Sequence, residues 1–207
     1  MVINQQDPGF DEPVREPGDS KPFRLFSHHF ATGELRLLAP YDATAMLALV
    51  ESERAHFETW LPWAREMRTE QDAREFIARG TARYAEFGTP WTGIWVAGEL
   101  VGGVLFWPVD DMGRHVELGY WLAARAGGRG VMTDAIAVLL DYCFAELGLN
   151  KVVIRCAAQN TASRGVPRRL GFTEEGVLRE HLFLDGAAHD LVVYGLLRRE
   201  WSGRSSQ

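Results

Sequence analysis

The stretch RAGGRGVMTDAIAVLL, residues 125–140, places three glycines and two arginines directly before a helix-like apolar pattern. Apolar residues recur three and four positions apart from Met132 to Leu147, which predicts an amphipathic helix that stops at Gly148. A helix N-terminus carries unpaired N–H groups and partial positive charge. Glycines before it let the backbone turn several N–H groups toward one anion. The stretch therefore predicts a phosphate-binding loop, with a glycine-rich turn that binds no ligand as the alternative.

The spacing excludes two common phosphate motifs. A P-loop requires a lysine directly after its last glycine, and here Val131 follows Gly130. The dinucleotide-binding pattern GxGxxG is not met either, because the spacing is Arg125-x-x-Gly128-x-Gly130. The loop is therefore neither a P-loop nor a dinucleotide-binding loop.

Composition is that of one globular domain. The chain has 207 residues, of which 46% are hydrophobic and 24% charged, enough for a sizeable core. A net charge of −6 argues against nucleic acid as a direct partner. Two cysteines, Cys143 and Cys156, fall in a predicted helix and strand, so we expect no disulfide framework and a cytoplasmic location. No segment has the apolar length of a signal peptide or membrane span, so no membrane partner is expected.

The N-terminus differs from the rest of the chain. Residues 1–22 contain several Pro-Gly and acidic turn signals, which predicts a flexible arm. Residues 23–207 form the predicted domain. Strands are expected near 33–40, 90–97, 99–108, 114–123, 150–158 and 173–197, with turns at Ala97-Gly98 and Asp185-Gly186. Helices are expected near 41–54, 69–87 and 160–171, and the first of them is expected to end at Pro62.

Several motifs together resemble the GCN5-related N-acetyltransferase (GNAT) family. The loop Arg125-x-x-Gly128-x-Gly130 is similar to its acyl-CoA pyrophosphate loop, and NTASRGVPRRLGF (160–172) is similar to its Asn-containing helix. Further pieces, ETWLPWA, ELGYWL and FLDGAAHDLVVYGLLRREW, resemble the RimJ/RimL-type branch of ribosomal-protein alanine and serine N-acetyltransferases. The resemblance implies an α+β fold: a single GNAT domain with a mixed, mostly antiparallel sheet of about seven strands, splayed at the acyl-CoA site and flanked by helices.

The same resemblance implies an acetyl-CoA site. Backbone N–H groups of the loop would bind the pyrophosphate, and the backbone of 118–122 would pair with the pantetheine. The residues expected to bind acetyl-CoA are Leu118, Tyr120, Trp121, Leu122, Arg125, Gly128, Arg129, Gly130, Val131, Met132, Thr133, Asn160, Ser163 and Arg164. Arg168 is expected near the phosphates, and no metal is expected.

One departure from the family pattern is informative. Many members read N-x-x-A-x-x-L-Y, with the tyrosine as general acid, whereas the same frame here ends in Pro167. Proline has no N–H to bond the carbonyl of Ser163, so this turn is expected to be distorted. Ser163 would supply the proton in place of the tyrosine, as proposed for the RimJ/RimL-type branch. A helix-capping role is the alternative for both Ser163 and Asn160.

The remaining site predictions concern the acceptor. Glu117 is the candidate general base, with a salt-bridged strand residue as the alternative. Trp60, Trp63 and Glu180 are candidates for the acceptor site, although the tryptophans could equally be core residues. An α-amine, with a pKa of about 7.7–8, needs only a weak base or a water relay to become neutral.

These predictions lead to one function and two alternatives. The chain is expected to be an acetyl-CoA-dependent N-acetyltransferase acting on the α-amine of a basic ribosomal protein. Transfer is expected to be direct, because neither cysteine falls in the predicted cleft segments. The alternatives are acetylation of a small amine, such as an antibiotic, polyamine or amino-acid conjugate, and a non-catalytic acyl-CoA-binding module. A homodimer is expected from the resemblance.

Overall fold

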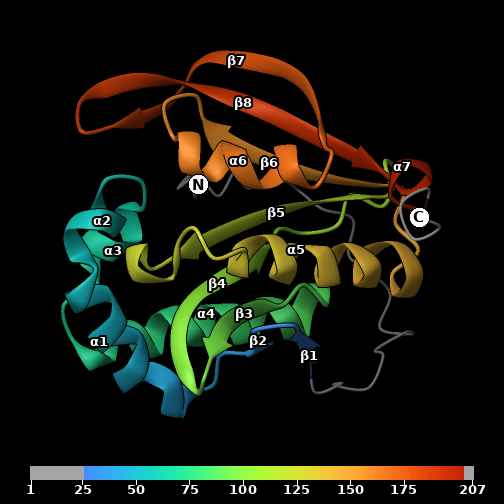
Figure 1. The fold of residues 1–207 in the computed structure, drawn as a ribbon. Helices are drawn as coiled ribbons and strands as arrows, with labels where there is room; N and C mark the ends of the chain where they lie inside the picture. Colours follow the sequence, from blue (N-terminus) through green and yellow to red (C-terminus); the bar gives the residue numbers. More distant parts are fainter. Residues whose placement is uncertain (1–25, 203–207) are drawn as a thin grey trace.

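A computed structural model describes residues 26–202, so the predicted arm, residues 1–22, lies outside the described residues. Eight strands form one open sheet in the order β1-β2-β3-β4-β5-β6-β8-β7 (Figure 1). Neighbouring strands are antiparallel except β5 and β6, which are parallel. The strands are β1 (Ser27–Phe30), β2 (Gly33–Leu37), β3 (Trp91–Val96), β4 (Glu99–Phe106), β5 (His115–Leu122), β6 (Lys151–Ala157), β7 (Thr173–Leu184) and β8 (Ala187–Leu197).

The mixed, mostly antiparallel sheet confirms the predicted fold class, but the count of about seven strands was one too low. The additional strand is β1, which pairs with β2 from Ser27–Arg36 to Phe30–Gly33. Its sequence, SHHF, lacks the alternation of apolar and polar residues that marks a half-buried strand. Pairing at the edge of the sheet, rather than its own pattern, makes this segment a strand.

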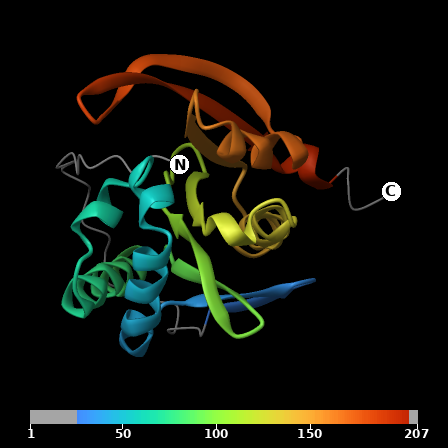
Figure 2. The ribbon, with the colours of Figure 1, turned by 60° about the vertical axis from the view of Figure 1, so that its left-hand side comes forward.

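Helices cover both faces of the sheet (Figure 2). On one face lie α1 (Ala43–Ser52), α2 (Arg54–Glu58), α3 (Pro62–Glu66) and α4 (Glu70–Phe87). On the other lie α5 (Val131–Asp141), which continues as a π-helical turn (Tyr142–Glu146), and α6 (Thr161–Arg169). Single 3-10 turns occur at Pro40–Asp42 and Ala124–Ala126, and α7 (Arg198–Ser202) closes the described residues.

Pro62 begins a helix instead of ending one. It occupies the first turn of α3, where its missing N–H would have had no intrahelical partner. The prediction that Pro62 ends the first helix was therefore wrong. The helix directly before it, α2, ends at Glu58, and Glu53 separates α2 from α1.

The sheet is splayed between its two parallel strands. β5 pairs with β6 only from His115–Lys151 to Glu117–Val153. Beyond these pairs, residues 118–122 of β5 pair with β4, and residues 154–157 of β6 pair with β8. The backbone edge of β5 that faces β6 is therefore released from strand pairing after Glu117, as the family resemblance implied.

An aromatic cluster fixes α2, α3 and α4 on β5. The ring of Trp121 on β5 makes edge-to-face contacts with Phe57 of α2 at 5.6 Å and with Trp63 of α3 at 5.4 Å between centroids. Trp63 also packs on Phe76 of α4 at 4.8 Å. Such pairs add to the stabilisation from apolar burial. The position of the helices relative to the splayed strand depends on this cluster.

Replacing Phe57 with alanine should destabilise the domain. The ring is 1% exposed, and removing it leaves a cavity that costs about 3–5 kcal/mol of unfolding free energy. Thr59→Ala is the matched control, because the exposed Thr59 hydroxyl only returns to the carbonyl of Ala55. The control should change stability by less than about 0.5 kcal/mol. Chemical denaturation measures both, and a loss below about 1 kcal/mol for Phe57→Ala would contradict the packing argument.

Candidate active site

The loop between β5 and α5 has the backbone conformation of an anion site. Gly128 and Gly130 have φ angles of 73° and 81°, a region that favours glycine, and Gly130 is the N-cap of α5. Residues 127–130 are exposed, whereas the side chains of Val131 and Met132 point into the core. The first N–H groups of α5 are therefore presented to solvent on an exposed loop, and the residues fit a diphosphate group.

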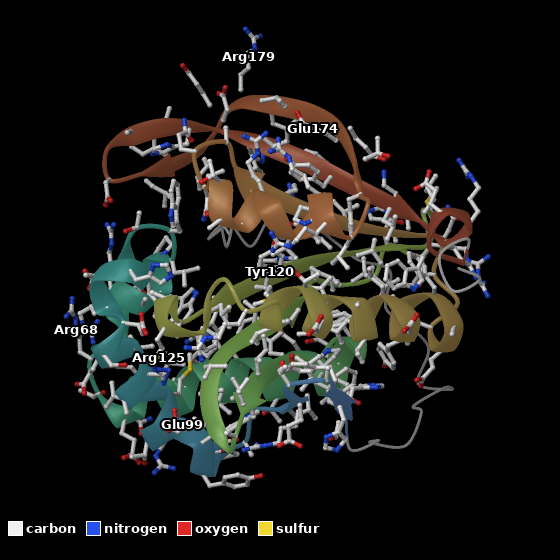
Figure 3. The ribbon with its side chains drawn as sticks, in the orientation of Figure 1. Arg68, Glu99, Tyr120, Arg125, Glu174 and Arg179 are labelled. Atoms are coloured by element: carbon white, nitrogen blue, oxygen red, sulfur yellow. The ribbon has the colours of Figure 1, made fainter. Side chains whose placement is uncertain are left out.

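Arginine side chains surround this loop in different ways. Arg125 is exposed, and its Nη2 lies 3.7 Å from Oε2 of Glu99 (both labelled in Figure 3). Arg129 is exposed within the loop itself. Arg169, at the end of α6, donates from Nε to the Thr133 hydroxyl oxygen of α5 at 3.1 Å. Arg169 was not among the predicted residues, and it adds positive charge beside the start of α5.

Ser163 lies in the gap between the splayed strands. Its side chain is 8% exposed, and its Oγ lies 3.2 Å from Cys156 Sγ of β6 and 3.3 Å from the hydroxyl of Tyr120 on β5 (Figure 3 labels Tyr120). Burial raises the pKa of the Tyr120 hydroxyl well above its ordinary value, so this group is neutral and can donate. The gap thus contains three side chains within hydrogen-bonding distance of one another: Tyr120, Cys156 and Ser163.

Asn160, rather than Ser163, caps α6. The Oδ1 atom of Asn160 accepts a hydrogen bond from the Ser163 backbone N–H at 3.0 Å. This satisfies one of the unpaired N–H groups of the helix. Capping uses only the carbonyl oxygen, so the two N–H donors of the Asn160 amide are not consumed by it.

Glu117 is held in an ion pair. Its Oε2 lies 2.5 Å from Nη2 of Arg155 on β6, with side-chain exposures of 16% and 29%. Glu117 belongs to the last pair of residues that joins β5 to β6, so the ion pair stands at the start of the splay. The salt-bridged alternative therefore describes the observed contact, and the role of Glu117 as a base stays a prediction.

Arg164 points away from the loop and into a polar network under β7 and β8. Its guanidinium donates to the Tyr194 hydroxyl at 3.0 Å and to the Ala158 carbonyl at 2.8 Å. Glu174 accepts from Tyr194 at 3.1 Å and lies 3.4 Å from Arg164 and 3.6 Å from Arg168. These contacts raise the pKa of Arg164, chiefly through its hydrogen bond to Tyr194. Neither Arg164 nor Arg168 is brought to the glycine loop by the contacts described.

The three predicted acceptor residues have different surroundings. Trp63 is 7% exposed within the aromatic cluster. Trp60 is half-buried, and its ring makes an edge-to-face contact with His189 of β8 at 6.2 Å. Glu180 is exposed on a bulge of β7, where its N–H donates to Asp190. The structure therefore does not bring Trp60, Trp63 and Glu180 together as one surface.

The first helical layer also touches the tip of the β7–β8 hairpin. Arg65 of α3 forms a bidentate ion pair with Asp185, the turn residue of the hairpin. This contact lowers the pKa of the Asp185 carboxyl. Together with Trp60 and His189, it joins two parts of the chain that are far apart in sequence and adjacent in Figure 1.

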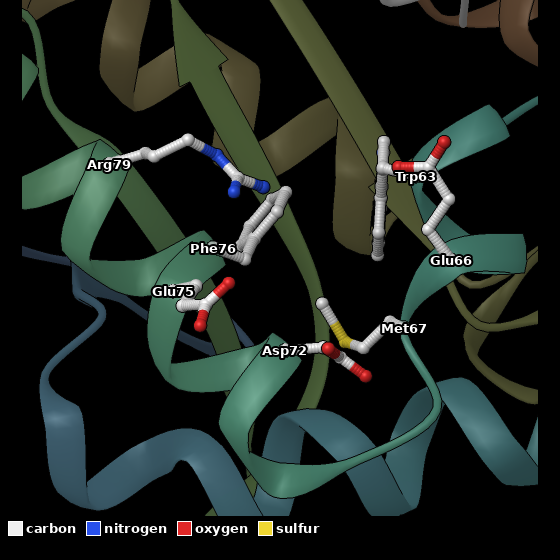
Figure 4. Close-up of a pocket in the computed structure, with 7 residues that line it drawn as sticks. All are labelled: Trp63, Glu66, Met67, Asp72, Glu75, Phe76 and Arg79. Atoms are coloured by element: carbon white, nitrogen blue, oxygen red, sulfur yellow. The ribbon is translucent and has the colours of Figure 1, made fainter.

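A small pocket lies between α3 and α4, away from the glycine loop (Figure 4). Its volume is about 110 Å³, and Trp63, Phe76 and Met67 line it with four charged side chains, Glu66, Asp72, Glu75 and Arg79. Asp72 is already used, because its Oδ2 accepts from the N–H and hydroxyl of Thr69 in the predicted capping box of α4. None of the lining residues belongs to β5, β6, α5 or α6, so this pocket is distinct from the splay.

Cys156 is closer to the site than the sequence suggested. The expectation that neither cysteine falls in the cleft segments was wrong for Cys156, whose sulfur contacts Ser163 Oγ. Alternation along β6 predicts a buried Cys156, but not that α6 places Ser163 over it. Cys143 is buried in the core, and burial raises the pKa of its thiol.

Residues 26–202 offer neither a metal site nor a membrane-spanning helix. No three His, Cys, Asp or Glu side chains there are grouped so that they could hold a metal ion. No helix of this part of the chain combines the length and hydrophobicity needed to cross a membrane.

Comparison with known proteins decides the family. Residues 34–173 match the model of the acetyltransferase (GNAT) domain, about two thirds of the chain. The chain belongs to the GNAT family. It is 39% identical over 170 residues to YdaF of Bacillus subtilis, provisionally named a ribosomal N-acetyltransferase, covering 82% of this chain and 93% of YdaF.

Two other relatives extend this result. The ribosomal-protein-serine acetyltransferase of Escherichia coli is 26% identical over 162 residues, covering 78% of this chain and 90% of its own. The crystal structure of the microcin C7 self-immunity acetyltransferase MccE, in complex with acetyl-CoA and AMP, superposes with a TM-score of 0.76 at 26% identity. That match covers 80% of this chain and 92% of MccE. The GNAT chain described here is an acetyl-CoA-dependent N-acetyltransferase of the RimJ/RimL-type branch.

The glycine loop should tolerate alanine poorly at Gly128. An alanine at φ 73° costs about 1–2 kcal/mol, and rotation to relieve this strain turns the adjacent N–H groups away from the bound phosphates. We expect the Kd for acetyl-CoA to rise about tenfold or more by isothermal titration calorimetry.

Gly88→Ala is the matched control for this variant. Gly88 also has a positive φ, 67°, and open space around its missing Cβ, but it ends α4 on the other side of the sheet. The control should lose similar thermal stability and keep the affinity of the wild type. Equal Kd changes in the two variants would contradict a specific role for the loop.

Proposed function

We propose that this enzyme transfers the acetyl group of acetyl-CoA to the N-terminal α-amine of a basic protein, such as a ribosomal protein. The observation that carries the proposal is the 39% identity to YdaF over 82% of this chain and 93% of YdaF. The Escherichia coli serine enzyme supports the same acceptor class. The chain's net charge of −6 favours a basic acceptor through long-range attraction.

The glycine loop and the free edge of β5 would hold acetyl-CoA. Loop N–H groups of residues 128–133 suit the diphosphate, and Arg129 and Arg169 add positive charge nearby. The edge of residues 118–122 that faces β6 offers backbone donors and acceptors to an amide-containing pantetheine chain. Acetyl-CoA supplies an acetyl group activated as a thioester. The chain's own residues must then orient the acceptor and handle its proton.

Ser163 is the proposed acid. As the new C–N bond forms and the C–S bond breaks, negative charge develops on the departing sulfur, which needs a proton or a hydrogen bond. Ser163 is the hydroxyl at the start of α6 that lies in the splay, with Oγ between β5 and β6. Pro167 occupies the position of the usual tyrosine and has no proton to give. A buried hydroxyl held at fixed geometry can stabilise charge at little reorganisation cost.

Glu117 remains the proposed base, acting through water. The amine must lose a proton before or during attack, and an α-amine with a pKa of about 7.7–8 requires only modest help. Arg155 holds the carboxylate in an ion pair at the start of the splay. This arrangement suits an α-amine better than a lysine, whose amine has a pKa near 10.4.

A small-molecule acceptor is the second candidate. MccE, whose structure this chain resembles at 26% identity, is a self-immunity acetyltransferase for microcin C7. The fold accommodates both classes of acceptor, and the acetyl-CoA machinery would be shared. Acetylation assays must separate them.

An acetylation assay tests the proposed acceptor. Purified enzyme and acetyl-CoA should acetylate basic peptides that begin with Ser or Ala, as detected by intact-mass spectrometry. Peptides of the same sequence with a blocked N-terminus are the matched control, and an internal lysine in them should stay unmodified. Met-starting peptides and small amines complete the panel. Acetylation of small amines alone would move the function to the second candidate.

Two alanine variants separate the role of Ser163 from that of the adjacent Cys156. Ser163→Ala should lower kcat about 10- to 100-fold with little change in acetyl-CoA affinity, because the hydroxyl acts on charge that develops only during transfer. Cys156→Ala, which changes the adjacent side chain, should lower kcat less than about threefold if transfer is direct.

The outcomes against this prediction are distinct. An unchanged kcat in Ser163→Ala would remove Ser163 from the mechanism. An acetyl group trapped on Cys156 during turnover, detected by peptide mass spectrometry, would contradict direct transfer. A Cys156→Ala variant as slow as Ser163→Ala would argue the same way.

A further inference from the structure

Pro167 deprives Ser163 of a helical hydrogen bond. In an α-helix the N–H of residue 167 would bond the carbonyl of Ser163, four residues earlier, and proline has no N–H. α6 nevertheless continues through Pro167 to Arg169. A buried carbonyl left without a partner costs free energy, so its partner must come from elsewhere.

Tyr120 supplies that partner from another element. Its hydroxyl, on β5, donates to the Ser163 carbonyl oxygen at 2.7 Å. The tyrosine is 43 residues earlier in the chain and 5% exposed, so the hydrogen bond crosses the splay in a buried environment. Such a bond is stronger than one in water, because no solvent competes for either group.

The same hydroxyl also contacts the side chain of Ser163. Ser163 Oγ donates to Tyr120 Oη at 3.3 Å, while the tyrosine proton goes to the carbonyl. Each hydroxyl has one proton, and both are used. Cys156 Sγ, 3.2 Å from Ser163 Oγ, is then the donor to the serine oxygen. One tyrosine hydroxyl therefore contacts both the backbone and the hydroxyl of the proposed acid.

We propose that Tyr120 is a positioning residue that replaces the missing N–H of residue 167 and holds Ser163 at the splay. The proposal rests on the proposed function only where it treats Ser163 as the acid. Tyr120 lies within the segment of β5 whose free edge would carry the pantetheine, so one strand fixes both the thioester and the acid. The distance between them does not then depend on pairing between β5 and β6.

Two substitutions test this exchange of partners. Tyr120→Phe keeps the ring and removes the hydroxyl, whereas Pro167→Ala gives residue 167 an N–H that the Ser163 carbonyl can accept. In the native background, Tyr120→Phe should lower Tm by roughly 2–6 °C. It should lower kcat about tenfold, with the KM for acetyl-CoA changed by less than about twofold.

In the Pro167→Ala background, Tyr120→Phe should cause smaller losses of Tm and kcat. There, Tyr120→Phe should lower Tm by at most about half as many degrees, and the logarithm of kcat by at most about half as much, because the helical N–H already bonds the carbonyl. Full additivity of the two substitutions would overturn the proposal. So would a Tyr120→Phe enzyme with unchanged Tm and kcat.

Controls separate this proposal from the role of Ser163. In a Ser163→Ala background, Tyr120→Phe should lower kcat no further, because its kinetic effect passes through the serine hydroxyl. If Ser163→Ala alone leaves kcat unchanged, the proposed acid is wrong, while non-additive Tm values would still support the replacement of the helical N–H. Tyr84→Phe removes a half-buried phenol from α4 and should leave kcat unchanged.

Discussion

β5 and β6 pair with each other over three residues and then separate. After Glu117 and Val153, β5 continues against β4, and β6 continues against β8. A parallel pair that parts in this way leaves backbone donors and acceptors unpaired along one strand, and these need another partner. The glycine loop follows β5 directly, so the unpaired edge and the start of α5 form one continuous site for an extended, phosphate-bearing molecule.

Side chains from three elements meet in the gap. Tyr120 comes from β5, Cys156 from β6 and Ser163 from α6, and all are at least nine-tenths buried. On the opposite face, the ring of Trp121 packs against Phe57 of α2 and Trp63 of α3. Adjacent residues of one strand therefore fix the two sides of the site, because side chains of a strand alternate between its faces.

Local signals in the sequence were sufficient for the loop and for most elements. Positive φ angles at Gly128 and Gly130 follow from the glycine pattern, and the Thr69–Asp72 cap follows from its spacing. Contacts between distant segments were not available to such reasoning. The meeting of Cys156 with Ser163, and of Arg169 with Thr133, depends on how α6 lies over the sheet. The sequence shows that Pro167 removes the N–H partner of the Ser163 carbonyl, but only the fold shows that Tyr120 replaces it.

The short pairing of β5 with β6 also divides the sheet into two parts. β6, β8 and β7 form one half-sheet, and β1 to β5 form the other. Only three residue pairs join them within the sheet; the Glu117–Arg155 ion pair, the contacts of α6 and the hairpin tip, and the shared apolar core join them outside it. A ligand seated along the free edge of β5 would bridge the halves. Binding of acetyl-CoA would therefore also stabilise the domain at the point where its sheet is weakest.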